Sequence, residues 1–236
     1  MDSTQVTDAA TLLRNYTWPF MPPGSIWLRA NMVMSLDGVV VDSAGRSGSL
    51  STEPDRVLFN ALRRDCDVVL VGAGTVRAER YQPAPWPVAL VTDAVQLPKD
   101  LPILDPAGGP VMVLTSERGA RDAQPWIRER CEVFACGAEQ VDLRVALQRL
   151  ADAGLFRVHC EGGTRLLSTL VAEDLVDELL VTVSPQLLGG PPDIHLIDLP
   201  NALDPVRTGR FEHVVTIDQT VFLRTTLRAK PRLHGG

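Results

Sequence analysis

Apolar runs of strand length alternate with amphipathic stretches over most of this 236-residue chain. Strand-like runs occupy residues 26–34, 67–71, 88–92, 111–115 and 156–160, and a short apolar stretch lies at 133–135. Apolar residues at helical spacing predict helices over residues 51–64, 118–130 and 142–153 and over the segment that begins at 164. Strands separated by helices are typical of a parallel sheet that is covered on both faces.

The pattern changes near the C-terminus, where strand-like runs follow one another without a comparable helix between them. These runs are residues 179–183, 211–217 and 221–227, and Asp218-Gln219 predicts a hairpin. We therefore expect an α/β fold whose mainly parallel central sheet is flanked by helices and ends in antiparallel C-terminal strands. The expected organisation is an N-terminal arm at 1–24, one domain at 25–229 and a disordered tail at 230–236.

Composition narrows the class of protein. Hydrophobic residues make up 45% of the chain, and the formal net charge is −6. An acidic chain without a basic cluster is a poor nucleic-acid binder. No apolar run approaches the roughly 20 residues that cross a bilayer, and the N-terminal residues lack a signal pattern, so we expect a cytoplasmic protein. The cysteines form no CxxC pair and the histidines have no metal-ligand spacing, so we expect no metal site.

Two glycine motifs follow strand-like runs and precede predicted helices. They are Gly72-Ala73-Gly74-Thr75 and Glu161-Gly162-Gly163-Thr164. Glycine at such a turn lets backbone N–H groups approach a ligand, and the helix behind it favours an anion. The first motif is only a partial GxGxxG because Arg77 takes the third glycine position, so a simple tight turn is the alternative. Glu161 has the alternative role of a helix cap.

The strand after the first motif bears on the choice of cofactor. It ends at Thr92 rather than at the acidic residue with which NAD-dependent enzymes hold the ribose. A hydroxyl there suits a 2′-phosphate, which favours NADP over NAD; the alternative is an ordinary loop threonine. Two phosphate-binding turns in one chain then predict a dinucleotide ligand.

Polar residues gather at the end of the first predicted strand. Asn31, Ser35 and Asp37 lie where an α/β sheet binds its ligands. A carboxylate there suits the N–H groups of an amino-pyrimidine or a proton relay. The alternative for Asp37 is an ordinary Asp-Gly turn.

Four motifs in order resemble those of one family: SLDG at 35–38, VGAGTVRAE at 71–79, CEGGTRLL at 160–167 and SPQLLGG at 184–190. Over about residues 26–228 the chain resembles the reductase domain of the riboflavin-biosynthesis deaminase/reductase, which has a dihydrofolate-reductase-like fold. The resemblance implies a stand-alone, homodimeric, NADPH-dependent oxidoreductase. Its substrate would be 5-amino-6-(5-phosphoribosylamino)uracil or the diamino-pyrimidinone analogue, reduced to the ribitylamino product.

The resemblance and the residue pattern together predict the site. Cofactor contacts are expected at Gly72, Gly74, Thr75, Val76, Thr92, Gly162, Gly163, Thr164 and Leu166. The phosphorylated pyrimidine is expected near Asn31, Ser35, Asp37 and Arg56. Asp37 and Glu161 are the predicted catalytic carboxylates.

Two departures from the family pattern fall on the expected substrate side. Residues 39–41 are all valine where the family often has a basic residue, and Glu79-Arg80-Tyr81 replaces a frequent Asp-Pro pair. They leave two alternatives open. One is a dihydrofolate or pterin reductase, which shares the fold and the amino-pyrimidine head group. The other is a non-catalytic NADP-binding protein that keeps the glycine turns without the substrate site.

Overall fold

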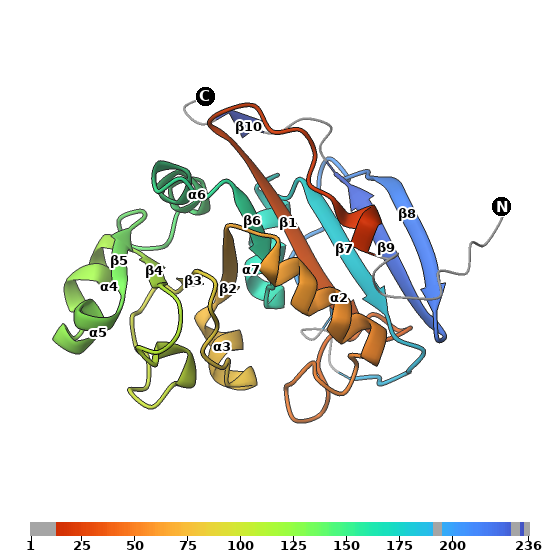
Figure 1. The fold of residues 1–236 in the computed structure, drawn as a ribbon, viewed down its shortest axis with the longest axis horizontal. Helices are drawn as coiled ribbons and strands as arrows, with labels where there is room; N and C mark the ends of the chain where they lie inside the picture. Colours follow the sequence, from red (N-terminus) through yellow and green to blue (C-terminus); the bar gives the residue numbers. More distant parts are fainter. Residues whose placement is uncertain (1–12, 191–194, 228–231, 234–236) are drawn as a thin grey trace.

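The computed structural model describes residues 13–190, 195–227 and 232–233. A ten-stranded sheet has the strand order β5-β4-β3-β2-β6-β1-β7-β9-β8, and β10 pairs with β1. The strands are β1 Ser25–Met34, β2 Val68–Gly72, β3 Val88–Val91, β4 Val111–Thr115, β5 Glu132–Ala135, β6 Arg157–Cys160, β7 Glu178–Val183, β8 Arg210–Ile217, β9 Thr220–Thr226 and β10 Arg232–Leu233. The helices are η1 Arg14–Tyr16, α2 Glu53–Arg64, α3 Ala73–Glu79, η2 Pro102–Leu104, α4 Glu117–Asp122, α5 Pro125–Arg130, α6 Leu143–Asp152 and α7 Thr164–Ala172. Figure 1 shows this arrangement.

The predicted α/β architecture is confirmed. The strands from β5 to β7 in the sheet order are parallel, whereas β9 runs antiparallel to both β7 and β8. The β8–β9 connection is the predicted hairpin: Asp218 and Gln219 both have positive φ angles, 46° and 66°, as a tight two-residue connection requires.

Two local predictions differ from the structure. The single helix expected over residues 118–130 is wrong, because α4 ends at Asp122 and α5 begins at Pro125. Gln124 is extended, with φ −61° and ψ 146°, since a residue before proline avoids the helical region. Within the expected disordered tail, Arg232–Leu233 instead pairs with the start of β1; the rest of that tail, like residues 1–12 of the expected arm, lies outside the described residues.

The order of the sheet fixes where a ligand can bind. From β1 the chain moves through α2 to β2 and on to β5, and it then returns to insert β6 between β1 and β2. Helices α6 and α7 pack on one face of the sheet through Leu147, Leu167 and Leu170, while α3 packs on the other face through Ala73 and Val76. The reversal of strand order therefore lies at the carboxyl ends of β1, β6 and β2, where open α/β sheets bind ligands. No helix among the described residues has the length and apolar character to cross a membrane.

Part of the expected N-terminal arm belongs to the folded domain. Arg29 of β1 is fully buried and forms an ion pair with Glu178, which also pairs with Arg224. The Arg29 guanidinium donates to the carbonyl oxygen of Tyr16 at 2.7 Å and lies 4.1 Å from the ring centroid of Trp18. The buried cation thus fixes the chain that precedes β1 and satisfies its own donors in doing so.

Replacing Tyr16 with alanine should lower the free energy of unfolding by about 3–5 kcal/mol. The Tyr16 ring is 2% exposed and packs against Leu58, Leu62, Leu180, Val215, Ile217 and Phe222. Its hydroxyl has no partner among the described residues, so Tyr16→Phe should be neutral or stabilising. Denaturant titration checks both values, with Phe20→Ala as the control because Phe20 is 86% exposed. A loss in Tyr16→Phe as large as in Tyr16→Ala would contradict this packing role.

Candidate active site

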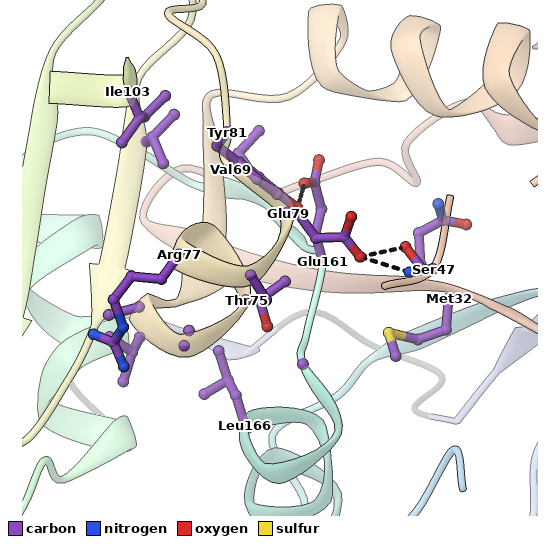
Figure 2. A pocket seen from close by; sticks show the side chains of 18 of the residues that line it. Met32, Ser47, Val69, Thr75, Arg77, Glu79, Tyr81, Ile103, Glu161 and Leu166 are labelled. Carbon is purple, nitrogen blue, oxygen red and sulfur yellow. Dashed lines mark hydrogen bonds between the residues drawn. The ribbon is translucent and has the colours of Figure 1, made fainter. Parts of the chain in front are cut away.

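A cavity of about 1110 Å³ lies at the carboxyl edge of the sheet (Figure 2). Its wall includes Asn31 from β1, Asp55 from α2, Gly72 at the end of β2, Thr75 from α3 and Thr164 from α7. Pockets for drug-sized ligands occupy roughly 300–1000 Å³. The volume therefore suits two ligands side by side, such as a dinucleotide and a substrate.

The two glycine motifs form one interlocked turn. The Gly72 N–H donates to the carbonyl oxygen of Gly162 at 2.7 Å, and a Cβ on Gly163 would lie 2.7 Å from the Thr75 hydroxyl. The peptide bond between the two glycines is cis. Because any side chain at Gly163 would collide with α3, the glycine keeps the two turns in contact.

This turn leaves donors for an anion at the start of α7. Gly163 is the N-cap of α7, and no side chain caps the helix. Thr164, Arg165 and Leu166, which form its first turn, line the cavity. The N–H groups of a first helical turn have no partner within the helix, so the turn offers the kind of cradle that binds phosphate.

Most of the predicted cofactor residues line the cavity: Gly72, Gly74, Thr75, Thr92, Gly163, Thr164 and Leu166. Val76 and Gly162 are not among the lining residues. Val76 is fully buried in the core under α3, and a Cβ on Gly162 would meet the Met32 sulfur at 2.9 Å. The Val76 side chain and the space beside Gly162 thus face protein, and the predicted cofactor contacts of these two residues are left to the backbone.

Glu161 lies on the cavity wall with both carboxylate oxygens engaged. It accepts hydrogen bonds from Arg63, at 2.6 and 2.7 Å, and from the Tyr81 hydroxyl at 2.6 Å; Figure 2 shows the bond to Tyr81. His159 lies 3.8 Å away, and burial lowers the His159 pKa to about 4, so this imidazole is neutral near pH 7. These contacts orient Glu161 at the start of the glycine turn. Its catalytic role stays a prediction.

Asp37 lies outside the cavity-lining residues, as does Ser35. The Asp37 carboxylate accepts hydrogen bonds from the Ser35 hydroxyl at 2.6 Å, the Gly189 N–H at 2.6 Å and the Leu188 N–H at 3.2 Å. Bonds from Ser35 and Gly189 lower the pKa of Asp37 to about 2. Asp37 therefore fastens the chain after β1 to the chain after β7, and its predicted contact with substrate remains untested.

Sequence reasoning missed a further carboxylate of the cavity wall, Asp55. It lies in the first turn of α2 and is 5% exposed. Its hydrogen-bond donors are the Ser51 hydroxyl, at 2.5 Å, and the Thr182 hydroxyl. Burial raises the Asp55 pKa, against the effect of these hydroxyls and of Arg56. Acidic residues are common in the first turn of a helix, where they interact favourably with the helix dipole. The sequence therefore offered no reason to assign Asp55 to the site.

Asn31 and Arg56, two predicted substrate residues, share the cavity with Asp55. The Asn31 side chain is buried, and its Oδ1 has no partner among the described residues. Arg56 is half exposed and lies 3.7 Å from Glu53. The wall formed by β1 and α2 therefore presents a carboxylate, an amide oxygen and a cation.

Two residues of the segment that replaces the Asp-Pro pair, Glu79 and Tyr81, also bridge the site. Glu79 accepts hydrogen bonds from the Ser47 backbone N–H at 2.6 Å and from the Ser47 hydroxyl at 2.9 Å. Tyr81 reaches Glu161, as described above. Glu79 thus joins the end of α3 to the β1–α2 loop across the cavity (Figure 2), and this contact was not foreseen from the sequence.

Known proteins resemble this chain in sequence or in fold. The 2,5-diamino-6-ribosylamino-4(3H)-pyrimidinone 5′-phosphate reductase of Methanothermobacter thermautotrophicus is 33% identical over 178 residues, which cover 71% of this chain and 82% of that protein. A pyrimidine reductase-like protein from Corynebacterium diphtheriae has a TM-score of 0.72 at 21% identity, covering 85% of this chain and 91% of that one. A dihydrofolate reductase from Enterococcus faecalis, complexed with NADP(H), has a TM-score of 0.52 at 14% identity, covering 85% and 95%.

A family model matches most of the chain, well beyond the two glycine motifs. Residues 26–223 match the model described as the RibD C-terminal domain, a range that includes both glycine turns, Asp55 and every strand from β2 to β8. The chain therefore belongs to the RibD C-terminal domain family.

Proposed function

We propose that this protein is an NADPH-dependent reductase of riboflavin biosynthesis. Its substrate would be 5-amino-6-(5-phosphoribosylamino)uracil or the diamino-pyrimidinone analogue, and its product the ribitylamino compound. The observation that carries the proposal is one cavity with two different walls. The interlocked glycine turn and the first turn of α7 suit cofactor phosphates, and Asp55 with Asn31 suits an amino-pyrimidine.

The main task of the protein in this reaction is to orient the cofactor and the substrate. When bound, the nicotinamide supplies a hydride to C1′ of the ring-opened imine form of the ribosylamino group, and the imine nitrogen takes up a proton. Asp55 is held by hydroxyl donors and can accept N–H groups of the pyrimidine or carry a proton, because burial raises its pKa. Asn31 Oδ1 adds a second acceptor on the same wall. Arg56 is the cation of that wall and is our candidate for the substrate phosphate.

A dihydrofolate or pterin reductase is the second candidate, and one observation favours it. Next to the polar wall, three aromatic rings surround Arg63, with centroids 4.0 Å (Phe59), 5.0 Å (Tyr81) and 5.9 Å (Trp86) from its guanidinium carbon. All three rings line the cavity. Such a wall suits an extended aromatic substrate as well as a sugar phosphate.

Assembly and location remain part of the proposal. We expect a homodimer, because the edge strand β8 exposes Phe211 and Val214, at 65% and 56%, and apolar side chains on an edge invite pairing. Light scattering at micromolar concentration distinguishes dimer from monomer. The cytoplasmic location expected from the sequence is retained as a prediction.

Steady-state oxidation of NADPH tests the proposed function. The purified protein should turn over with the phosphoribosylamino-uracil or its diamino-pyrimidinone analogue and be much slower with dihydrofolate. Turnover with dihydrofolate alone would show that the protein is a dihydrofolate or pterin reductase instead. Tight binding of NADPH without turnover of any of these compounds would instead favour a non-catalytic NADP-binding protein.

A further inference from the structure

We propose that Arg77 selects the phosphorylated nicotinamide cofactor by pairing with its ribose 2′-phosphate. The inference rests on the proposed function, because it assumes a nicotinamide dinucleotide along the glycine turns. It gives to α3 the discriminating role that the sequence had assigned to Thr92.

Arg77 lies in the part of the cavity expected to hold the cofactor. It is exposed on α3 and lines the cavity. A Cβ on Gly74 would lie 4.0 Å from Arg77 Nη2, so the guanidinium folds back along the helix to the glycine turn. Figure 2 shows Arg77 across α3 from Glu161 and Ser47, away from the side of the cavity that carries the polar substrate wall.

The Arg77 charge is available for a ligand. Within the described part of the chain, no ion pair or side-chain hydrogen bond involves Arg77, whereas Arg63 is bound to Glu161 and Arg56 lies 3.7 Å from Glu53. A guanidinium can bind phosphate through two parallel hydrogen bonds. An unpaired guanidinium next to the turn is therefore suited to a dianionic phosphate group in a chain that is otherwise acidic.

The residues after β3 do not provide this interaction. The Thr92 hydroxyl donates to the carbonyl oxygen of Ala94 at 2.8 Å, so its one proton is used. Asp93 follows Thr92 directly and brings a carboxylate to this side of the cavity, about 20 residues after Gly72, although the sequence pattern had assigned no ribose-binding acid to the end of this strand. Its Oδ1 accepts the Val141 N–H at 2.8 Å, and both Thr92 and Asp93 line the cavity. A carboxylate repels a 2′-phosphate, so an NADP-dependent protein needs a cation from another element, and Arg77 supplies it.

Binding measurements test this role without reference to turnover. Quenching of intrinsic fluorescence, to which Trp86 on the cavity wall contributes, gives Kd for NADPH and NADH. Arg77→Ala should weaken NADPH binding by about 10- to 100-fold, the loss of a charge-assisted hydrogen bond, and change NADH binding by less than about twofold. Asp93→Asn should shift the preference toward NADPH. Arg80→Asn is the matched control: it removes another exposed arginine of the cavity wall, asparagine tolerates the positive φ of this position, and the NADPH/NADH ratio should stay unchanged.

The outcomes separate this inference from the proposed function. If the wild type prefers NADPH and Arg77→Ala keeps the same NADPH/NADH ratio, the role of Arg77 is wrong and the reductase proposal stands. A wild type that prefers NADH also overturns the inference. A wild type that binds neither nucleotide removes the proposed function itself.

Discussion

Asp55→Asn is expected to lower turnover by about 10²-fold or more, the usual scale for a positioned acid–base group, while NADPH affinity stays nearly constant. Asparagine keeps the size of the side chain and can still accept the Ser51 hydroxyl. It cannot carry the negative charge or the proton of Asp55 on the substrate wall. The loss should therefore appear in kcat rather than in cofactor binding.

Stability distinguishes this functional role from a structural one. Because burial raises the Asp55 pKa above its unfolded value, the native state favours the protonated carboxyl, and ionisation of Asp55 costs stability as pH rises through the folded pKa. Asp55→Asn avoids that cost. It should be as stable as the wild type or more stable at neutral pH, and the difference should vanish at pH values below the unfolded pKa. Denaturant midpoints from about pH 3, below the ordinary aspartate pKa of about 3.9, up to about pH 8 measure this difference.

Asp37→Asn is the matched control for Asp55→Asn. Its carboxylate is also held by neutral donors, but it joins two loops outside the cavity wall. We expect a loss of stability there with a much smaller loss of kcat. If Asp37→Asn abolishes turnover and Asp55→Asn does not, the catalytic assignment made from the sequence is right, and ours is wrong.

The sheet was predictable because its signals are local. A strand buried on both faces must be apolar along its whole length, so the runs that became β1 and β4 were visible without tertiary information. The hairpin at Asp218-Gln219 was visible because two strand-like runs, 211–217 and 221–227, flank a short polar gap. The break before Pro125 carried an equally local signal, and giving it less weight than the apolar spacing of residues 118–130 produced the wrong helix.

The site was predictable only where the backbone itself demands a residue type. Both glycine turns were found because glycines between a strand-like run and a predicted helix form a local pattern, and at Gly163 the structure gives a reason for the glycine, since a Cβ there would lie 2.7 Å from the Thr75 hydroxyl. The carboxylates were harder, because their roles depend on partners far away in sequence. Arg63 and Glu161 are 98 residues apart, and Asp37 and Gly189 are 152 apart. Asp37 and Asp55 look equally polar in the sequence, and only the fold separates the one bound by loops from the one facing the cavity.

Gly74→Val is expected to weaken NADPH binding by roughly 100-fold, the upper range for forcing extra methyl groups into a filled site. Gly74 is exposed in the first turn of α3, and a Cβ there meets no protein atom nearer than 4.0 Å. The nearest atom to that Cβ is Arg77 Nη2, the end of a flexible side chain, so the new side chain enters the space proposed for cofactor phosphates without a backbone collision at Cβ. Gly163 is the less suitable position, because a substitution there collides with Thr75 and changes the turn as well as the ligand space.

Replacing Gly74 with alanine should raise the stability of the protein and lower its affinity for NADPH. Glycine within a helix costs about 0.5–1 kcal/mol relative to alanine, so Gly74→Ala should be slightly more stable than the wild type and yet bind NADPH more weakly. Gly74→Val should extend the binding loss. Gly48→Ala is the control, since Gly48 also lines the cavity with no atom within 4 Å of its Cβ position but lies on the β1–α2 loop. Titration calorimetry with NADPH and thermal unfolding of all three variants measure both quantities. Equal NADPH affinity in a stable Gly74→Val variant and in the wild type would mean that the cofactor does not pass over the first turn of α3. The added side chain would occupy that space and would weaken binding if the cofactor lay there.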